Sequence, residues 1–96
     1  MNVFICDPDI VHHEHLRTMI MTWGKTHRHE KDLFVQSFGS SNELIDAWEK
    51  SLNMDILFIA SAFPGDVSGF ETAYRIQREQ SGIPIILMMK DKRVYL

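Results

Sequence analysis

The 96-residue sequence predicts an α/β fold, a three-layer α/β/α unit with a parallel sheet in the strand order 2-1-3-4. Four short apolar runs alternate with three segments of helical periodicity, which is the pattern of successive β-α-β units. The run Ile56–Ile59 is apolar without alternation, as in a strand that helices cover on both faces. Because each connection contains a helix, the strands should be parallel and the crossovers right-handed.

The first strand is predicted over residues 2–6 and the first helix over residues 10–23. Asp9 is a good N-cap for that helix, and Gly24 is placed to end it. The apolar residues that share one face of this helix are Leu16, Ile20 and Trp23.

The second strand is predicted over residues 33–38, and Gly39 ends it. Ser40 and Glu43 match a capping box, so a second helix should begin there and continue to Leu52. Its apolar positions are Leu44, Ala47, Trp48 and Leu52.

The third strand is predicted over residues 55–60, the third helix over residues 68–80 and the fourth strand over residues 84–89. The inward positions expected on the third helix are Phe70, Ala73 and Tyr74, with Ile76 or Gln77. Residues 90–96 are interpreted as the first turn of a fourth helix.

Composition narrows the class of protein. The chain forms one domain at most, residues 1–96, and a 45% hydrophobic composition excludes a disordered class. A formal charge of −3 argues against nucleic-acid contact by this segment. A single cysteine suits a reducing cytoplasm, and no apolar run approaches the ~20 residues of a membrane span, so we expect a cytoplasmic protein without membrane contact.

Five short motifs carry a family resemblance through their order and spacing. They are Phe4-Ile5-Cys6-Asp7, Asp55-Ile-Leu-Phe-Ile, Phe63-Pro64-Gly65, Ser68-Gly69-Phe70-Glu71 and Ile83-Pro84-Ile85-Ile86-Leu87. The chain resembles the receiver domain of bacterial two-component response regulators, lacking the fifth strand and the last helix. The first and third motifs look most like the LytTR class, including accessory-gene-regulator types, in which a DNA-binding effector domain would follow.

The resemblance implies phosphoryl transfer from a histidine kinase to an aspartate, with Mg²⁺ held by an acid pair. Asp7 matches the first acid, but Pro8 stands at the second position and Asp9 comes one residue late. Ala60 stands at the phosphoacceptor position and Met89 at that of the switch hydroxyl, while the family's lysine has no counterpart in the chain. We therefore expect a degenerate receiver with no catalytic residue, no cofactor, and weak or absent Mg²⁺ binding.

The resemblance favours a pseudo-receiver that acts by protein contact, with a histidine kinase or another regulator as partner, and not an enzyme. The alternative is a small-ligand-binding or enzymatic domain on a flavodoxin-like scaffold. The strand ends offer no glycine-rich phosphate loop and no nucleophile beside a base, which weighs against the alternative.

Five histidines could suggest a metal protein. His12 and His15 have the i, i+3 spacing that two ligands on a helix can use, but a third ligand at a diagnostic spacing is missing. The competing interpretation of His12, His13 and His15 is a solvated helix face with one histidine against the sheet. His27 and His29 are interpreted as surface residues.

The remaining distinctive side chains are interpreted mainly as structural. Cys6, Trp23, Trp48 and the Met88–Met89 pair are expected in the core, although an exposed tryptophan or methionine pair would suggest a contact surface. Asp66 is expected to be a loop residue that could otherwise help to hold a cation.

Because the fifth strand is expected to be absent, the fourth strand should form the edge of the sheet. A long apolar edge recruits other chains, so the sequence predicts a homodimer or larger assembly through residues 84–89, or a swap of residues 90–96.

Overall fold

The computed structural model describes residues 1–27, 32–50, 53–63, 65, 68–89 and 92–95. Three helices and five strands make up this part of the chain. In chain order they are β1 (Asn2–Cys6), α1 (Ile10–Thr26), β2 (Phe34–Phe38), α2 (Ser41–Glu49), β3 (Ile56–Ala60), α3 (Gly69–Glu79), β4 (Ile85–Met89) and β5 (Lys92–Tyr95). No helix of the described residues is long and apolar enough to cross a membrane.

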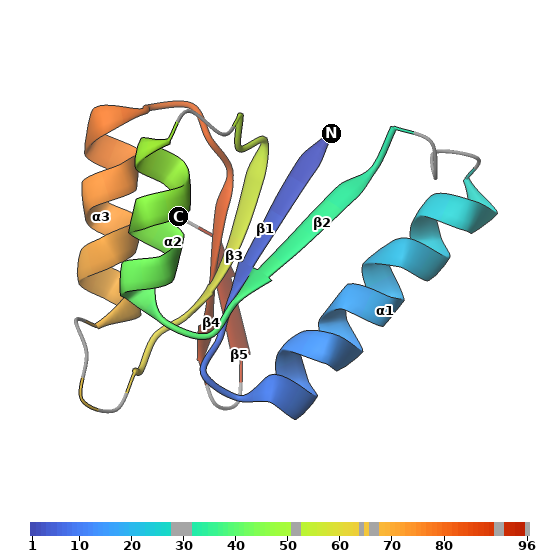
Figure 1. Ribbon diagram of the computed structural model, residues 1–96, viewed down its shortest axis with the longest axis horizontal. Helices are drawn as coiled ribbons and strands as arrows, with labels where there is room; N and C mark the ends of the chain where they lie inside the picture. The colour runs from blue at the N-terminus through green and yellow to red at the C-terminus, as the bar shows by residue number, and fades with distance from the viewer. Residues whose placement is uncertain (28–31, 51–52, 64, 66–67, 90–91, 96) are drawn as a thin grey trace.

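The predicted strand order is confirmed. The sheet runs β2-β1-β3-β4-β5, and the first four strands pair in parallel. Helix α1 covers one face of the sheet, while α2 and α3 lie side by side on the other face (Figure 1). The three expected layers are therefore present, with one helix on one side and two on the other.

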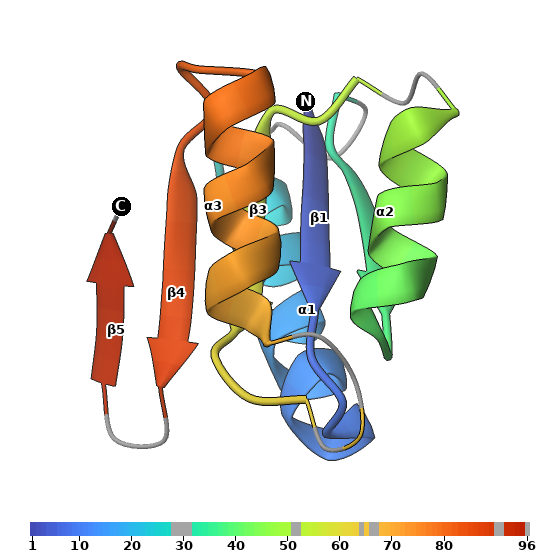
Figure 2. The same cartoon turned by 90° about the vertical axis from the view of Figure 1, so that its left-hand side faces the viewer.

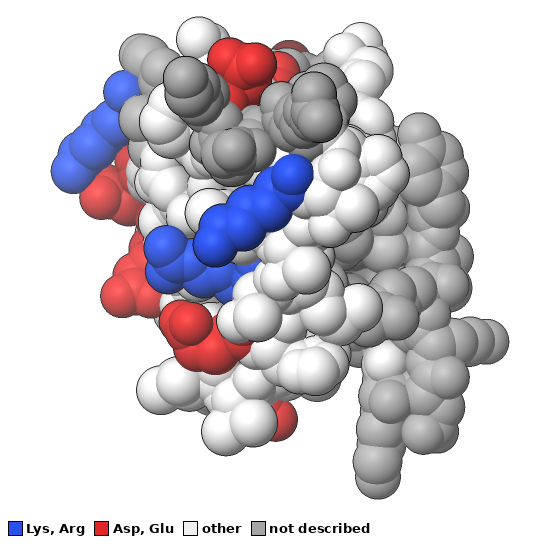
Figure 3. All heavy atoms as spheres, turned by 90° about the vertical axis from the view of Figure 1, so that its right-hand side faces the viewer, with Lys and Arg blue, Asp and Glu red and all other residues white. Residues whose placement is uncertain are grey.

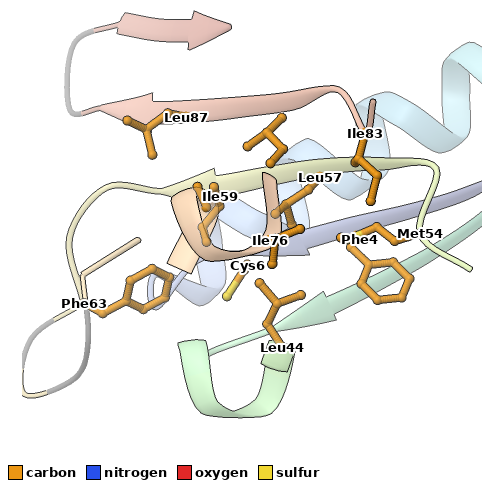
Figure 4. Packing of buried hydrophobic residues seen from close by; sticks show 12 residues of the cluster. Phe4, Cys6, Leu44, Met54, Leu57, Ile59, Phe63, Ile76, Ile83 and Leu87 are labelled. Atoms are coloured by element: carbon orange, nitrogen blue, oxygen red, sulfur yellow. The ribbon is translucent and has the colours of Figure 1, made fainter. Parts of the chain in front are cut away.

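Alternate residues of each strand enter two separate cores. On the α2 and α3 side the strands contribute fully buried residues such as Phe4, Leu57 and Ile85. Figure 4 shows side chains of this core, including Leu44 of α2 and Ile76 of α3, together with those of the strands. On the α1 side the second core consists of Val3, Ile5, Leu16, Leu33 and Met88. Both faces of the parallel strands are thus apolar, as the unbroken run at residues 56–59 predicted.

Residues 92–95 form a strand, so the interpretation of residues 90–96 as the first turn of a helix was wrong. β5 pairs with β4 in antiparallel register, with Leu87 opposite Val94 and Met89 opposite Lys92 (Figure 2). An antiparallel partner needs only a short connection, whereas a parallel fifth strand needs a crossover of about a dozen residues. Because β5 covers the outer side of β4, the predicted free edge is absent, and the predicted self-association through residues 84–89 loses its structural basis.

The three predicted helix starts are correct. Asp9, Ser40 and Ser68 are N-caps whose side chains each accept a hydrogen bond from the backbone N–H three residues later. The far end of α1 differs from the prediction, because the helix continues past Gly24 to Thr26. Gly24 is buried, and an added Cβ would lie 2.6 Å from a methyl carbon of Leu33. Gly24 therefore allows close packing and does not end the helix.

The rotation of α3 about its axis also differs from the prediction. Phe70 and Tyr74 are exposed by 54% and 57%, whereas Ala73 and Ile76 are fully buried. Gly69 explains the difference, because a Cβ at this position would lie 1.6 Å from the carbonyl oxygen of Ala60. Only glycine allows this approach, so the first turn of α3 must face β3 with Gly69 and turns Phe70 outward.

The two tryptophans do not share one environment. Trp23 was expected in the core but is 46% exposed, and its ring stacks on that of His27 with centroids 4.6 Å apart. Trp23 lines the apolar cavity beside α1 together with Val3, Leu16 and Leu33, and does not enter the second core itself. Trp48 packs at the border of the first core, and its Nε1–H donates to Oε1 of Gln80 at 2.9 Å.

Candidate functional site

The candidate site lies where β1, β3 and β4 end. Cys6 pairs with Ile59, so the residues that follow, Asp7 and Ala60, leave adjacent strands at the same edge of the sheet. Ligands of open α/β sheets bind at this edge. A pocket of about 380 Å³ opens there. Its lining residues are Asp7, Asp9, His12, Ala60, Ser61, Ala62, Met88 and Met89.

Asp7 is the buried acid of this pocket, with only 4% of its surface exposed. Its backbone N–H donates to the carbonyl of Phe38 at 2.9 Å, which fixes the end of β1 beside β2. Its carboxylate accepts on both oxygens: Oδ1 from the backbone N–H of Asp9 at 2.9 Å, and Oδ2 from Nδ1 of His12. Both oxygens of the carboxylate therefore already have partners within the chain.

The three histidines of α1 lie in three different environments. His13 is buried, and its Nδ1 lies 3.0 Å from the carbonyl oxygen of Asp7. His12 lines the pocket, and His15 is exposed. The prediction of one histidine against the sheet is correct, but the contact between His12 and Asp7 was missed. The signal was present: Asp9 is the N-cap, and the side chain three positions into a helix often reaches back toward the cap.

Position 60 offers a methyl group where the resemblance implies an acceptor carboxylate. Ala60 lies in the pocket with Met88 and Met89, and neither alanine nor methionine can form an acyl phosphate. Ser61 also lines the pocket, and its backbone N–H donates to the carbonyl of Met88 at 2.9 Å.

The residues of the pocket do not fit a divalent cation of the kind the family resemblance implies. Mg²⁺ prefers several oxygen ligands in octahedral geometry, including one or two carboxylates. Each carboxylate oxygen of Asp7 already accepts one hydrogen bond, and Oδ1 of Asp9 accepts the backbone N–H of His12 at 3.1 Å, so neither acid is left without a partner from the chain. Within the described ranges no group of three or more His, Cys, Asp or Glu side chains could hold a metal ion.

Other candidate positions contribute little to this site. Cys6 is fully buried, and its Sγ–H donates to the carbonyl of Ser40, as expected for a core thiol. Gly65 has a φ of 75°, which suits the predicted loop after β3. Asp66 and His29 lie outside the described residues.

A second cavity of about 400 Å³ lies beside α1, over the α1 face of the sheet. Its lining is entirely apolar: Met1, Val3, Leu16, Met19, Ile20, Trp23, Leu33, Ile56 and Phe58. The Lys, Arg, Asp and Glu side chains gather toward one side of this face, and other residues cover much of the rest of its described surface (Figure 3). Since Met19 and Trp23 are about half exposed, this face carries apolar surface in contact with water.

No protein-family model matches the chain, and no curated protein sequence matches it. Solved structures do. RcsB from Salmonella enterica serovar Typhimurium, bound to the promoter rprA in the presence of the phosphomimetic BeF₃⁻, superposes with a TM-score of 0.68 and 25% identity, covering 93% of this chain and 42% of that one. The receiver domain of Francisella response regulator 1452 gives a TM-score of 0.58 and 17% identity, covering 92% and 64%.

A fusion that contains the yeast Spc42 trimeric coiled coil gives a TM-score of 0.76 at 12% identity, covering 92% of this chain and 53% of that one. At that identity the likeness concerns the fold alone. The chain thus spans about half the length of the first solved chains that it matches. The structural neighbours include response regulator receiver domains, and the fold is receiver-like.

Proposed function

We propose that the chain is a receiver-like signalling module that does not accept aspartyl phosphate and acts by contact with another protein. The observation that carries the proposal is Ala60 at the carboxyl end of β3, in one pocket with the buried Asp7. The scaffold of a receiver is kept, while the atom that would receive the phosphoryl group is absent.

The structural neighbours support the signalling part of this proposal. RcsB is a response regulator whose complex contains DNA and a phosphomimetic, and the Francisella neighbour is a receiver domain. By analogy, the partner of this chain is a histidine kinase or another regulator, and its output is transcriptional control through an effector domain. Kinship with the LytTR class is part of the same proposal and rests on the sequence motifs alone.

The apolar surface beside α1 supports the contact part of the proposal. Exposed apolar patches on soluble domains often mark sites of protein interaction. Here the half-exposed side chains of Met19 and Trp23 border an apolar cavity. A contact made there would be independent of the chemistry at position 60, since the cavity shares no lining residue with the pocket at Asp7.

The proposal is tested by incubating the protein with acetyl phosphate and Mg²⁺ and measuring its intact mass. We expect no added phosphoryl group, while a receiver domain with an acceptor aspartate is labelled in the same tube. A hydroxylamine-labile phosphoryl adduct on this chain would refute the proposal. Binding to purified histidine kinases and regulators of the same organism should be equally strong with and without acetyl phosphate, and a dependence on the phosphodonor would also contradict it.

A further inference from the structure

We infer that His12 occupies the place of a metal ion at Asp7, so that the chain itself closes this pocket to divalent cations. The inference rests on the proposed function, because it explains how a receiver-like pocket is held together without metal or phosphate. It makes His12 the residue that determines whether the site can bind a cation.

The first support is the direction of the hydrogen bonds at Asp7. An ionised carboxylate can only accept, so the ring nitrogen Nδ1 of His12 must carry the proton and donate it to Oδ2. The backbone N–H of Asp9 donates to Oδ1 at 2.9 Å. A buried carboxylate needs such partners or a cation, and here donors from the chain supply them.

The second support is that the backbone holds His12 in this position. The N–H of His12 donates to Oδ1 of the N-cap Asp9 at 3.1 Å, which fixes the first turn of α1. The next residue, His13, is buried with its Nδ1 3.0 Å from the carbonyl oxygen of Asp7. The junction between β1 and α1 is therefore one hydrogen-bonded unit, which holds the backbone of His12 beside Asp7 and within reach of its carboxylate.

The third support is the chemistry of the remaining pocket. A cation that displaced His12 would find no carboxylate at position 8, which is proline, and none at position 60. Among the other lining residues only Ser61 offers a side-chain oxygen that is not already the cap of α1. Mg²⁺ gives up its water reluctantly, so a single recovered carboxylate would not compensate for the lost hydrogen bond.

The experiment compares the binding of Mn²⁺, which prefers the same oxygen ligands, in two backgrounds. In the wild-type background, paramagnetic broadening of the backbone amides of Asp9 and Ser61 is followed by NMR for the wild type, His12→Ala and the control His15→Ala. We expect weak but saturable broadening in His12→Ala, where the freed carboxylate of Asp7 is the one strong ligand, and no saturable broadening in the wild type or in His15→Ala. In the second background Ala60→Asp supplies another carboxylate, and free Mn²⁺ is counted by electron paramagnetic resonance.

In that second background, Ala60→Asp/His12→Ala should bind Mn²⁺ at least about tenfold more tightly than Ala60→Asp alone. Ala60→Asp/His12→Asn should remain weak, because the asparagine amide can still donate to Asp7. Ala60→Asp/His15→Ala should bind like Ala60→Asp. Circular dichroism confirms that each variant is folded, and the first background decides the question if the Ala60→Asp variants do not fold.

Equal Mn²⁺ binding with and without His12 in a folded background would overturn the inference. So would tight Mn²⁺ binding by the wild type at the Asp9 and Ser61 amides. Neither result would touch the proposed function, which fails only if the wild type forms an acyl phosphate or binds its partner in a phosphodonor-dependent way. The two failures are therefore distinguishable.

Discussion

Gly69 faces the carbonyl oxygen of Ala60 so closely that a Cβ on Gly69 would lie 1.6 Å from that oxygen and 2.8 Å from the carbonyl carbon. Both atoms belong to the backbone at the end of β3, which cannot rotate away as a side chain can. This approach sets the position of α3 against the sheet and, through Ala60, the shape of the candidate site.

Gly69→Ala should therefore destabilise the protein by about 3 kcal/mol or more, because α3 has to move off the sheet. Gly39→Ala is the matched control: the nearest atom to its added Cβ is a carboxylate oxygen of Glu43 at 3.7 Å, so we expect a change within about 0.5 kcal/mol. Urea unfolding followed by circular dichroism measures both. Equal midpoints for the two variants would show that α3 shifts without cost.

The observed rotation of α3 can be tested with two substitutions on the same helix. Ile76→Ala should cost about 3 kcal/mol, because Ile76 is fully buried and a cavity remains. Tyr74→Ala should cost about 1 kcal/mol or less, because its ring is 57% exposed and interacts mainly with Arg78. If the order of the two losses in urea unfolding were reversed, α3 would have the rotation that its apolar pattern first suggested.

The N-cap of α3 should have a measurable effect on stability. Ser68→Ala removes the acceptor of the backbone N–H of Glu71, now bonded at 3.2 Å, and should cost about 1 kcal/mol. Ser81→Ala, at an exposed serine just beyond the same helix, is the control and should be neutral. Thermal unfolding of both variants gives the comparison, and a neutral Ser68→Ala would mean that water replaces the cap.

Removing residues 90–96 should cause self-association. The shortened chain exposes the outer side of β4, which is apolar and five residues long, whereas β5 is short and has Lys92 and Arg93 in its sequence. We expect the shortened protein to sediment as a dimer or larger species at micromolar concentration, and the full chain to be smaller under the same conditions. A monomeric shortened protein would show that the exposed edge of β4 does not recruit other chains.

Restoring the acceptor alone should not restore phosphorylation. Ala60→Asp supplies the nucleophile, but Pro8 provides no second carboxylate and Met89 provides no hydroxyl group. In addition, His12 still donates a hydrogen bond to the carboxylate of Asp7. Labelling with acetyl phosphate and Mg²⁺, read by intact mass against an active receiver domain, should stay far below that of the active domain. Rapid labelling of Ala60→Asp would show that the other departures matter less than we argue.

The features that could be predicted from sequence depend on local chemistry or on rules of connection. The order 2-1-3-4 follows from helical crossovers, and the caps at Asp9 and Ser40 follow from side chains that can accept hydrogen bonds from the free N–H groups at the start of a helix. The meeting of Asp7 and Ala60 follows from the adjacency of β1 and β3, since parallel strands end at the same edge.

The features that were missed depend on contacts between distant residues. The exposure of Phe70 follows from the contact of Gly69 with Ala60, which no helical periodicity contains. Gly24 was interpreted as the end of a helix because glycine often has that position. Its true role, close packing against Leu33, involves another segment and is not visible in the local sequence. The contact between His12 and Asp7 depends on both the cap geometry and the end of β1. The strand β5 depends on antiparallel pairing with β4, where residues 90–96 had been interpreted as the start of a helix.

The position of β1 between β2 and β3 in the sheet has a consequence for how the chain folds. β1 is made first, but one of its partners is β3, and Asn2 is joined to Asp55 by a hydrogen bond across 53 residues of sequence. β5, in contrast, pairs with its immediate neighbour in the chain. Because closing a long loop costs entropy before its contacts form, the rate-limiting step of folding should be the docking of β1 between β2 and β3. During synthesis β1 can pair with β2 first, but its other edge has no partner until β3 at residues 56–60 has been made.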